Sequence, residues 1–156
     1  MIILNIIFLD VDGVLNSIDN LERVYKETNK PHSGFNYPFD EMCLGNLKIL
    51  VEKTNAKLVI TSIWRKSEIG KRKLLEVLKK YDLDKYVIGF TEVLNSTREE
   101  EIKKYLSNLE GKINYIILDD KTDFYELASF LVNTNIKYGL TKEDVEMGIK
   151  KLTKNL

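Results

Sequence analysis

The stretch Ile6-Ile7-Phe8-Leu9-Asp10-Val11-Asp12-Gly13-Val14-Leu15-Asn16 decides how the rest of the chain can fold. The apolar run from Ile2 to Leu9 is too short to cross a bilayer and too apolar to be half exposed. It predicts a strand buried on both faces, as in a parallel sheet covered by helices. Ligands bind at the carboxyl ends of such strands, where Asp10 and Asp12 fall. On these residues alone, Asp-Val-Asp-Gly as a simple polar turn is an open alternative.

Two later apolar runs also end in polar side chains. One ends in the hydroxyls of Thr61 and Ser62, and the other is followed directly by Asp119 and Asp120. Amphipathic segments with helical spacing separate these runs, and strands that alternate with helices predict a three-layer α/β sheet. The expected strands are 57–62, 86–88, 113–118 and 130–132, and the expected helices are 40–54, 67–81, 96–108 and a last one capped by Thr141 and Asp144.

The segment from Ser17 to Pro38 breaks this alternation. It contains both prolines and shows no periodicity apart from one short helix expected near Leu21 to Glu27. A loop of this length is often functional, and this one follows the acidic strand end, so we expect it to overhang that end as a cap-like loop. His32, the only histidine, lies in it.

Composition bounds the function. A chain of 156 residues predicts a single domain spanning residues 1–156. Lysine plus arginine and aspartate plus glutamate both total 24, so no overall field draws the protein to nucleic acid or to a membrane. The one cysteine, Cys43, fits a reducing compartment, and no basic leader or membrane span is present, so we expect a cytoplasmic protein. A local basic cluster between Arg65 and Lys80 is either a solvated helix face or a contact for a polyanionic substrate.

If the three strand ends converge, four carboxylates share one crevice. Two like charges about 4 Å apart repel by about 4 kcal/mol at an effective dielectric near 20, so such a cluster needs a counter-charge or bound protons. All-oxygen ligands indicate Mg²⁺. Zinc is disfavoured, because one cysteine and one histidine far apart in sequence do not form its usual site. Arg98, in the first turn of its helix, opposes the dipole preference and therefore hints at an anionic neighbour.

These motifs resemble, in order and spacing, the four motifs of the haloacid dehalogenase (HAD) superfamily. More particularly, the chain is similar to the small HAD-type domains of RNA-repair proteins over about residues 3 to 153. The matching segments are Phe8-Leu-Asp-Val-Asp-Gly-Val-Leu-Asn16, Thr61-Ser-Ile-Trp-Arg65, Arg98 with Glu101-Ile102, Ile117-Leu-Asp-Asp120 and Gly139-Leu-Thr141.

The resemblance implies a Rossmann-like fold with a minimal cap loop, and it implies residue roles. Asp10 is the expected nucleophile and Asp12 the expected general acid and base. Thr61 is expected to hydrogen-bond the transferring phosphoryl group, with Ser62 as a second candidate. The expected metal site consists of Asp10, the backbone carbonyl of Asp12, Asp119 and, in support, Asp120.

The basic residue departs from the superfamily pattern, which has a lysine. Arg98 is favoured here for its position and its bidentate fork, and Lys103 is the alternative. Arg65 and Trp64 fit the subfamily pattern. We expect Arg65 to contact substrate, and Trp64 to be either a core residue or a base-stacking platform.

The resulting expectation is a Mg²⁺-dependent phosphatase for phosphomonoesters, including a nucleotide or polynucleotide end. A receiver-type signalling domain and a catalytically silent HAD-like binding domain are the alternatives. The order of the motifs disfavours the first, and the presence of both Asp10 and Asp12 disfavours the second. No membrane partner is expected, and the sequence predicts no oligomeric state.

Overall fold

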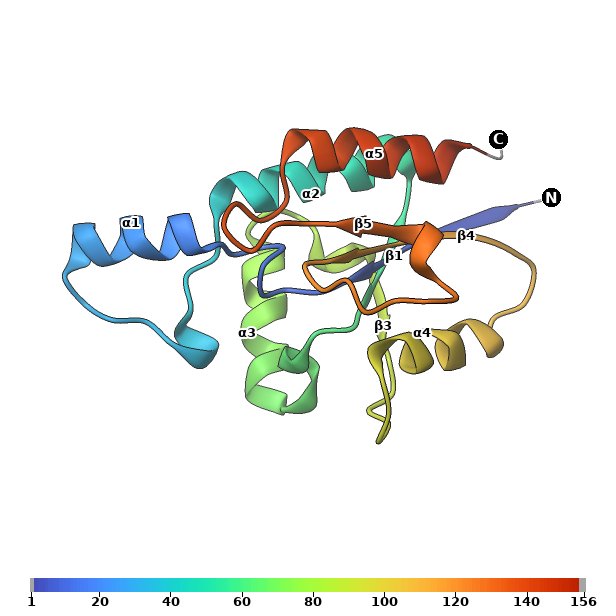
Figure 1. The fold of residues 1–156 in the computed structure, drawn as a ribbon, viewed down its shortest axis with the longest axis horizontal. Coiled ribbons are helices and arrows are strands. Elements are labelled where there is room, and N and C mark those ends of the chain that lie inside the picture. Colours follow the sequence, from blue (N-terminus) through green and yellow to red (C-terminus); the bar gives the residue numbers. More distant parts are fainter. Residues whose placement is uncertain (1, 155–156) are drawn as a thin grey trace.

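The structure, a computed structural model, describes residues 2–154 and contains a five-stranded parallel sheet (Figure 1). The strand order is β3-β2-β1-β4-β5, so the strand that precedes Asp10 lies at the centre. The strands are β1 (Ile3–Leu9), β2 (Lys57–Ile60), β3 (Val87–Phe90), β4 (Lys112–Asp119) and β5 (Leu131–Asn133). The α-helices are α1 (Ile18–Thr28), α2 (Glu41–Thr54), α3 (Glu68–Lys79), α4 (Arg98–Ser107) and α5 (Lys142–Thr153). Short 3₁₀ turns are η1 (Gly34–Asn36), η2 (Ile63–Lys66), η3 (Asp84–Tyr86) and η4 (Ala128–Phe130).

The side chains of β1 alternate between two hydrophobic clusters, one on each face of the sheet. Ile7 and Leu9 pack with residues of α2, α3 and α5, whereas Ile6 and Phe8 pack with Ile102 of α4 and with the segment after β4. All four β1 side chains are fully buried. Figure 1 shows α2 and α5 side by side, with α4 on the opposite side of the sheet. The three-layer α/β class predicted from the apolar run is therefore confirmed.

Helix capping follows the expected residues. Asp40 caps α2, Thr97 caps α4, and Thr141 with Asp144 forms the capping box of α5. The left-handed Asn55 ends α2. The third strand begins at Val87, one residue later than expected, because the residues before it form the η3 turn.

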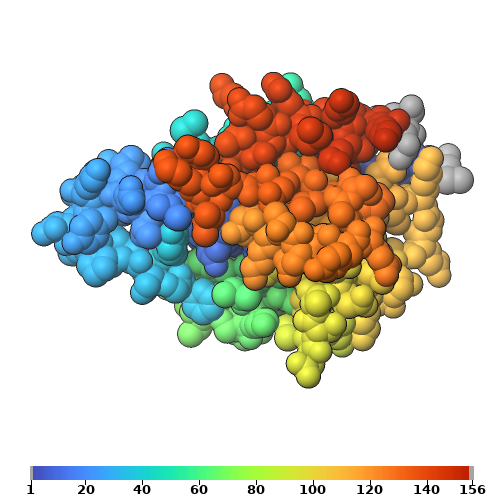
Figure 2. Space-filling view, in the orientation of Figure 1, coloured from blue at the N-terminus to red at the C-terminus, as the bar shows by residue number. Residues whose placement is uncertain are grey.

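The segment 17–38 is more structured than expected. Its helix, α1, begins at Ile18 rather than near Leu21, because the Ser17 side chain accepts a hydrogen bond from the Asn20 N–H and caps the helix three residues earlier. In Figure 2 this segment forms a lobe that projects from one end of the molecule. None of the helices in residues 2–154 combines the length and hydropathy that a membrane span requires.

Candidate active site

Three neighbouring strands bring their polar ends together. The Asp10 N–H donates to the Leu118 carbonyl at 3.1 Å, and the Thr61 N–H donates to the Leu9 carbonyl at 2.9 Å. These ladder bonds place the end of β1 between the ends of β2 and β4. Convergence follows from the parallel pairing, since the carboxyl ends of parallel strands share one edge of the sheet.

Three carboxylates form the centre of this edge. Asp10, Asp119 and Asp120 each offer an oxygen, and these oxygens all lie within 4.8 Å of one another. Asp10 is 5% exposed and Asp119 is fully buried. The Nη1 atom of Arg98 lies 2.8 Å from Asp119 Oδ2 and 3.2 Å from Asp10 Oδ2, so one guanidinium bridges two of the acids.

One guanidinium does not balance this cluster. Burial raises the pKa of Asp10 to about 8; the charge of Asp119 adds to the increase, and Arg98 opposes it. Burial and the charge of Asp119 also raise the pKa of Asp120. A further positive charge would favour the ionised forms, and the donor set is entirely oxygen. The three residues therefore fit a hard divalent cation.

Arg98 is held in place by its neighbour. It is the first residue of α4, and the next residue, Glu99, accepts backbone hydrogen bonds from Tyr125 at 2.7 Å and Leu127 at 3.1 Å. These bonds fix the start of α4 against the segment that follows β4. Lys103, the alternative basic residue, pairs instead with Glu126 at 2.8 Å and Glu100 at 3.4 Å. The structure thus brings Arg98, and not Lys103, to the carboxylates.

The loop after β1 presents Asp12. Gly13 has a φ of 81°, and a Cβ at this position would lie 2.7 Å from the Asp120 carboxylate, so both the turn and the close approach require glycine. Asn16 closes the loop: its Oδ1 accepts from the Gly13 N–H at 2.9 Å, and its Nδ2 donates to Asp12 Oδ1 at 2.8 Å. The half-buried Asp12 does not belong to the three-carboxylate cluster.

The two hydroxyls that follow β2 have different surroundings. Ser62 Oγ accepts from the Trp64 backbone N–H at 3.2 Å and caps η2. Thr61 Oγ1 is buried and has no hydrogen-bond partner within residues 2–154. Because an unpaired buried hydroxyl is costly, Thr61 is the hydroxyl ready to bind a ligand oxygen.

Arg65 is buried beneath the site. Its Nε donates to the Thr91 carbonyl at 2.8 Å, and its Nη1 donates to the carbonyls of Thr61 at 2.8 Å and Ser62 at 3.0 Å. Its Nη2 pairs with Glu101 Oε2 at 2.7 Å. All three guanidinium nitrogens therefore bind protein groups. This arrangement favours support of the Thr61 backbone over the substrate contact expected from the sequence.

Asn16 is a functional candidate that sequence reasoning missed, and for Trp64 it missed the contact with Asp12. The Trp64 indole N–H points at Asp12, with Nε1 3.3 Å from Oδ1 and 3.4 Å from Oδ2. Asn16 was within the opening motif and could have been found there. Nothing in the sequence indicated which way the Trp64 ring points.

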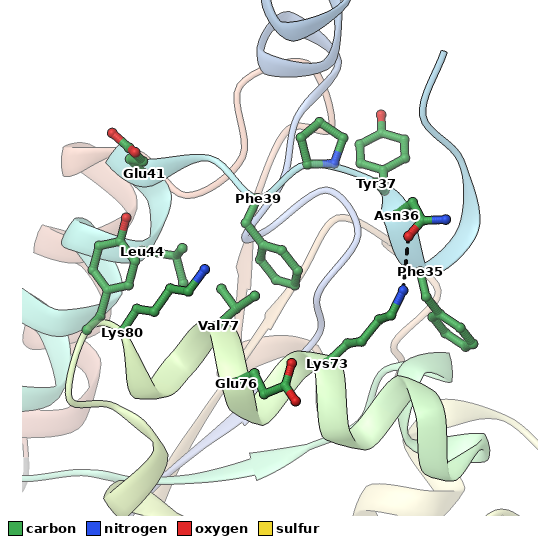
Figure 3. A pocket seen from close by; sticks show the side chains of 12 residues that line it. Phe35, Asn36, Tyr37, Phe39, Glu41, Leu44, Lys73, Glu76, Val77 and Lys80 are labelled. Atoms are coloured by element: carbon green, nitrogen blue, oxygen red, sulfur yellow. Dashed lines mark hydrogen bonds between the residues drawn. The ribbon is translucent and has the colours of Figure 1, made fainter. Parts of the chain in front are cut away.

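The Trp64 ring contacts two residues that line an aromatic groove. It packs edge-on against Phe35 and Phe39, with ring centroids 5.0 and 5.3 Å away. Figure 3 shows these two residues on one wall of the groove, opposite Lys73 and Val77 of α3. The groove has a volume of about 460 Å³.

Comparison with known families agrees with the fold. Residues 6–145 match the family described as the HAD domain in Swiss Army Knife RNA repair proteins. The chain belongs to this family, which confirms the resemblance carried by its motifs and suggests a phosphatase-type function. No curated protein matches the chain.

Proposed function

We propose that this chain is a Mg²⁺-dependent phosphatase that acts through an aspartyl-phosphate. The observation that carries the proposal is the buried Asp10, bridged to Asp119 by Arg98 at the end of the central strand. An acid in this setting lies beside a fixed cation, which stabilises the phosphoryl oxygens where charge develops. Family membership supports the same chemistry.

The reaction divides into two displacements. In the first, a carboxylate oxygen of Asp10 attacks phosphorus as the bond to the leaving oxygen breaks, and Asp12 gives its proton to that oxygen. In the second, Asp12 takes a proton from water, which attacks the phosphorus and frees Asp10 and inorganic phosphate. Arg98 and Thr61 donate hydrogen bonds to the phosphoryl oxygens during both displacements.

The metal has a proposed set of ligands in this chain. The side chains of Asp10, Asp119 and Asp120 and the backbone carbonyl of Asp12 would hold Mg²⁺, which supplies positive charge to the phosphoryl group when bound. With the metal held in this way, its charge would lie beside the Asp10 carboxylate.

The proposed substrate class is a nucleotide or polynucleotide end phosphate. A cavity of about 270 Å³ adjoins the site because Arg98 forms part of its wall, and the exposed Lys66 and Lys121 line it as well. Cations beside the reacting phosphate suit a substrate that carries further phosphates. The family description, which refers to RNA repair, points to the same class.

The test is hydrolysis of an aryl phosphate with and without Mg²⁺, by the wild type and by Asp10→Asn. Activity should require Mg²⁺ and should be lost in Asp10→Asn. Asp82→Asn is a matched control, since Asp82 is 75% exposed and pairs only weakly with Lys48 at 3.8 Å. Acid quenching with labelled substrate should trap phosphate on the wild-type protein. Hydrolysis that survives in Asp10→Asn would remove Asp10 as the nucleophile.

The substrate class has its own test. Double replacement of Lys66 and Lys121 by alanine should raise KM for a phosphorylated oligonucleotide and leave hydrolysis of the aryl phosphate unchanged. An equal effect on both substrates would argue against a polyanionic substrate.

A further inference from the structure

The indole of Trp64 lies at an unusual place for a buried core residue. It is 2% exposed, yet its only polar atom faces a carboxylate of the site, with Nε1 at 3.3 and 3.4 Å from the two oxygens of Asp12. The N–H is shared between both oxygens, and its distances are at the long end for a hydrogen bond. Contacts of this kind in a free enzyme shorten when substrate is bound.

Asp12 differs from Asp10 and Asp119 in how it is held. Asp10 and Asp119 both contact a cation, Arg98. The donors to Asp12 are neutral: the Asn16 amide at 2.8 Å from its own loop, and the Trp64 indole from η2. Two donors from different elements therefore fix the orientation of the Asp12 carboxyl group.

The Trp64 ring is itself tightly held. Phe35 and Phe39 contact it edge-on, at interplanar angles of 62° and 67°. Its backbone N–H bonds to Ser62 Oγ, and its carbonyl lies so close to Gly70 of α3 that a Cβ at Gly70 would collide with it. The indole N–H therefore has a fixed direction, set by η2, by α3 and by the segment between α1 and α2.

We infer that Trp64 is a positioning residue for the general acid and base, and that the aromatic segment Phe35–Phe39 keeps it aligned. This inference rests on the proposed function, in which Asp12 protonates the leaving oxygen. The indole N–H holds the Asp12 carboxyl group toward that oxygen, while Phe35 and Phe39, the residues that wall the groove of Figure 3, hold the indole. A segment of the cap-like loop is thereby coupled to proton transfer.

The kinetic test uses the leaving group. Trp64→Phe keeps an aromatic ring and loses the N–H. For glycerol phosphate, whose alkoxide must be protonated, kcat/KM, which reports only the first displacement, should fall by about 10- to 100-fold. For nitrophenyl phosphate, whose phenolate leaves without a proton, kcat/KM should fall by less than about threefold.

A second variant tests the alignment of the indole. Phe39→Leu keeps the indole N–H but removes a ring that aligns it, so kcat/KM should again fall more for glycerol phosphate than for nitrophenyl phosphate, by a smaller factor than in Trp64→Phe. If Trp64→Phe lowered kcat/KM equally for both substrates, Trp64 would have only a packing role and the inference would be overturned. If the wild type hydrolysed neither substrate, the proposed function would fail, and the geometry would be judged by the next measurement alone.

That measurement needs no activity. Trp64 is the only tryptophan, so the protein has one indole N–H resonance in a nitrogen–proton correlation spectrum. Asp12→Ala should shift this resonance and speed its hydrogen exchange, whereas Asp82→Ala should leave it in place. If the indole resonance had the same chemical shift and hydrogen-exchange rate in Asp12→Ala as in the wild type, the contact would be refuted, and with it the positioning role.

Discussion

Arg98 and Asp119 face each other at 2.8 Å, although one begins a helix and the other ends the strand that follows. The same Nη1 atom contacts Asp10 at 3.2 Å. A cation in the first turn of a helix is mildly unfavourable, and the two acids opposite it offset that cost. This relationship answers the question that the sequence left between Arg98 and Lys103 as far as contact with the carboxylates is concerned.

The two basic residues should therefore differ in catalysis. Arg98→Ala should lower kcat/KM for an aryl phosphate by about 100-fold or more, the usual effect of losing a donor to developing charge. Lys103→Ala should leave it within about threefold, because an exposed ion pair contributes little. Steady-state kinetics of both variants provides the comparison, and Arg98→Lys should recover part of the loss. Equal, small losses in both alanine variants would mean that neither supports the phosphoryl group.

Asp10 should limit stability in the absence of metal. Its folded-state pKa is raised from 3.8 to about 8, so the folded protein retains a proton that the unfolded chain releases. The free energy of unfolding therefore falls as pH rises through this window. Asn at position 10 resembles the neutral acid, so with chelator present Asp10→Asn should be the more stable protein at pH 8, by at least about 1 kcal/mol or roughly 2–4 °C in Tm.

Thermal unfolding at two pH values tests the predicted direction of this pH dependence. The advantage of Asp10→Asn should shrink markedly at pH 5, because the penalty on the wild type accumulates as pH rises from 3.8 to about 8 and only part of it has accumulated at pH 5. Asp82→Asn, at an exposed position, should show no such dependence. An advantage that is constant with pH would assign the effect to packing instead of charge.

Metal should stabilise the folded protein through the same acids. Mg²⁺ at about 100 times its Kd should add about 2.7 kcal/mol to the free energy of unfolding. Asp119→Asn should abolish the increase in Tm, because it removes a ligand of the three-carboxylate cluster. Thermal scans over a Mg²⁺ series, with Ca²⁺ in parallel, measure this. A full Mg²⁺ response in Asp119→Asn would place the metal elsewhere.

Arg65 should behave as a structural residue. Arg65→Met leaves Glu101 buried without its partner, and loss of one member of a buried pair costs about 3–5 kcal/mol. Denaturant unfolding should show this loss, whereas Lys66→Met, at the exposed neighbouring position, should change stability little. An Arg65 variant of normal stability but raised KM would restore the substrate-binding role expected from the sequence.

The periodicity of apolar residues and the positions of polar residues in the sequence predicted much of this fold. The apolar run before Asp10 could only be a strand buried on both faces, and this requirement fixed the sheet and the edge at which polar ends meet. Capping residues such as Asp40 and Thr141 predicted where helices begin, because a cap bonds only to backbone N–H groups two or three residues further along the chain. The start of α1 lies earlier than predicted because the aperiodic residues around Ser17 hide its role as a helix cap.

Side-chain direction was the part that sequence could not supply. Trp64 and Arg65 stand next to each other, and both are buried. Which one faces Asp12 and which one binds backbone carbonyls depends on the turn of η2 and on the rings of Phe35 and Phe39. These contacts join residues far apart in the chain, and no local pattern encodes them.

The position of Trp64 gives the protein a built-in optical probe. Ultraviolet excitation at the red edge of protein absorption reaches only this residue, and its emission arises within hydrogen-bonding distance of Asp12. Metal binding to the carboxylate cluster, or motion of the segment that holds the ring, would alter the emission wavelength or the fluorescence lifetime of Trp64. Stopped-flow fluorescence of the unlabelled protein can therefore follow events beside the acid in real time.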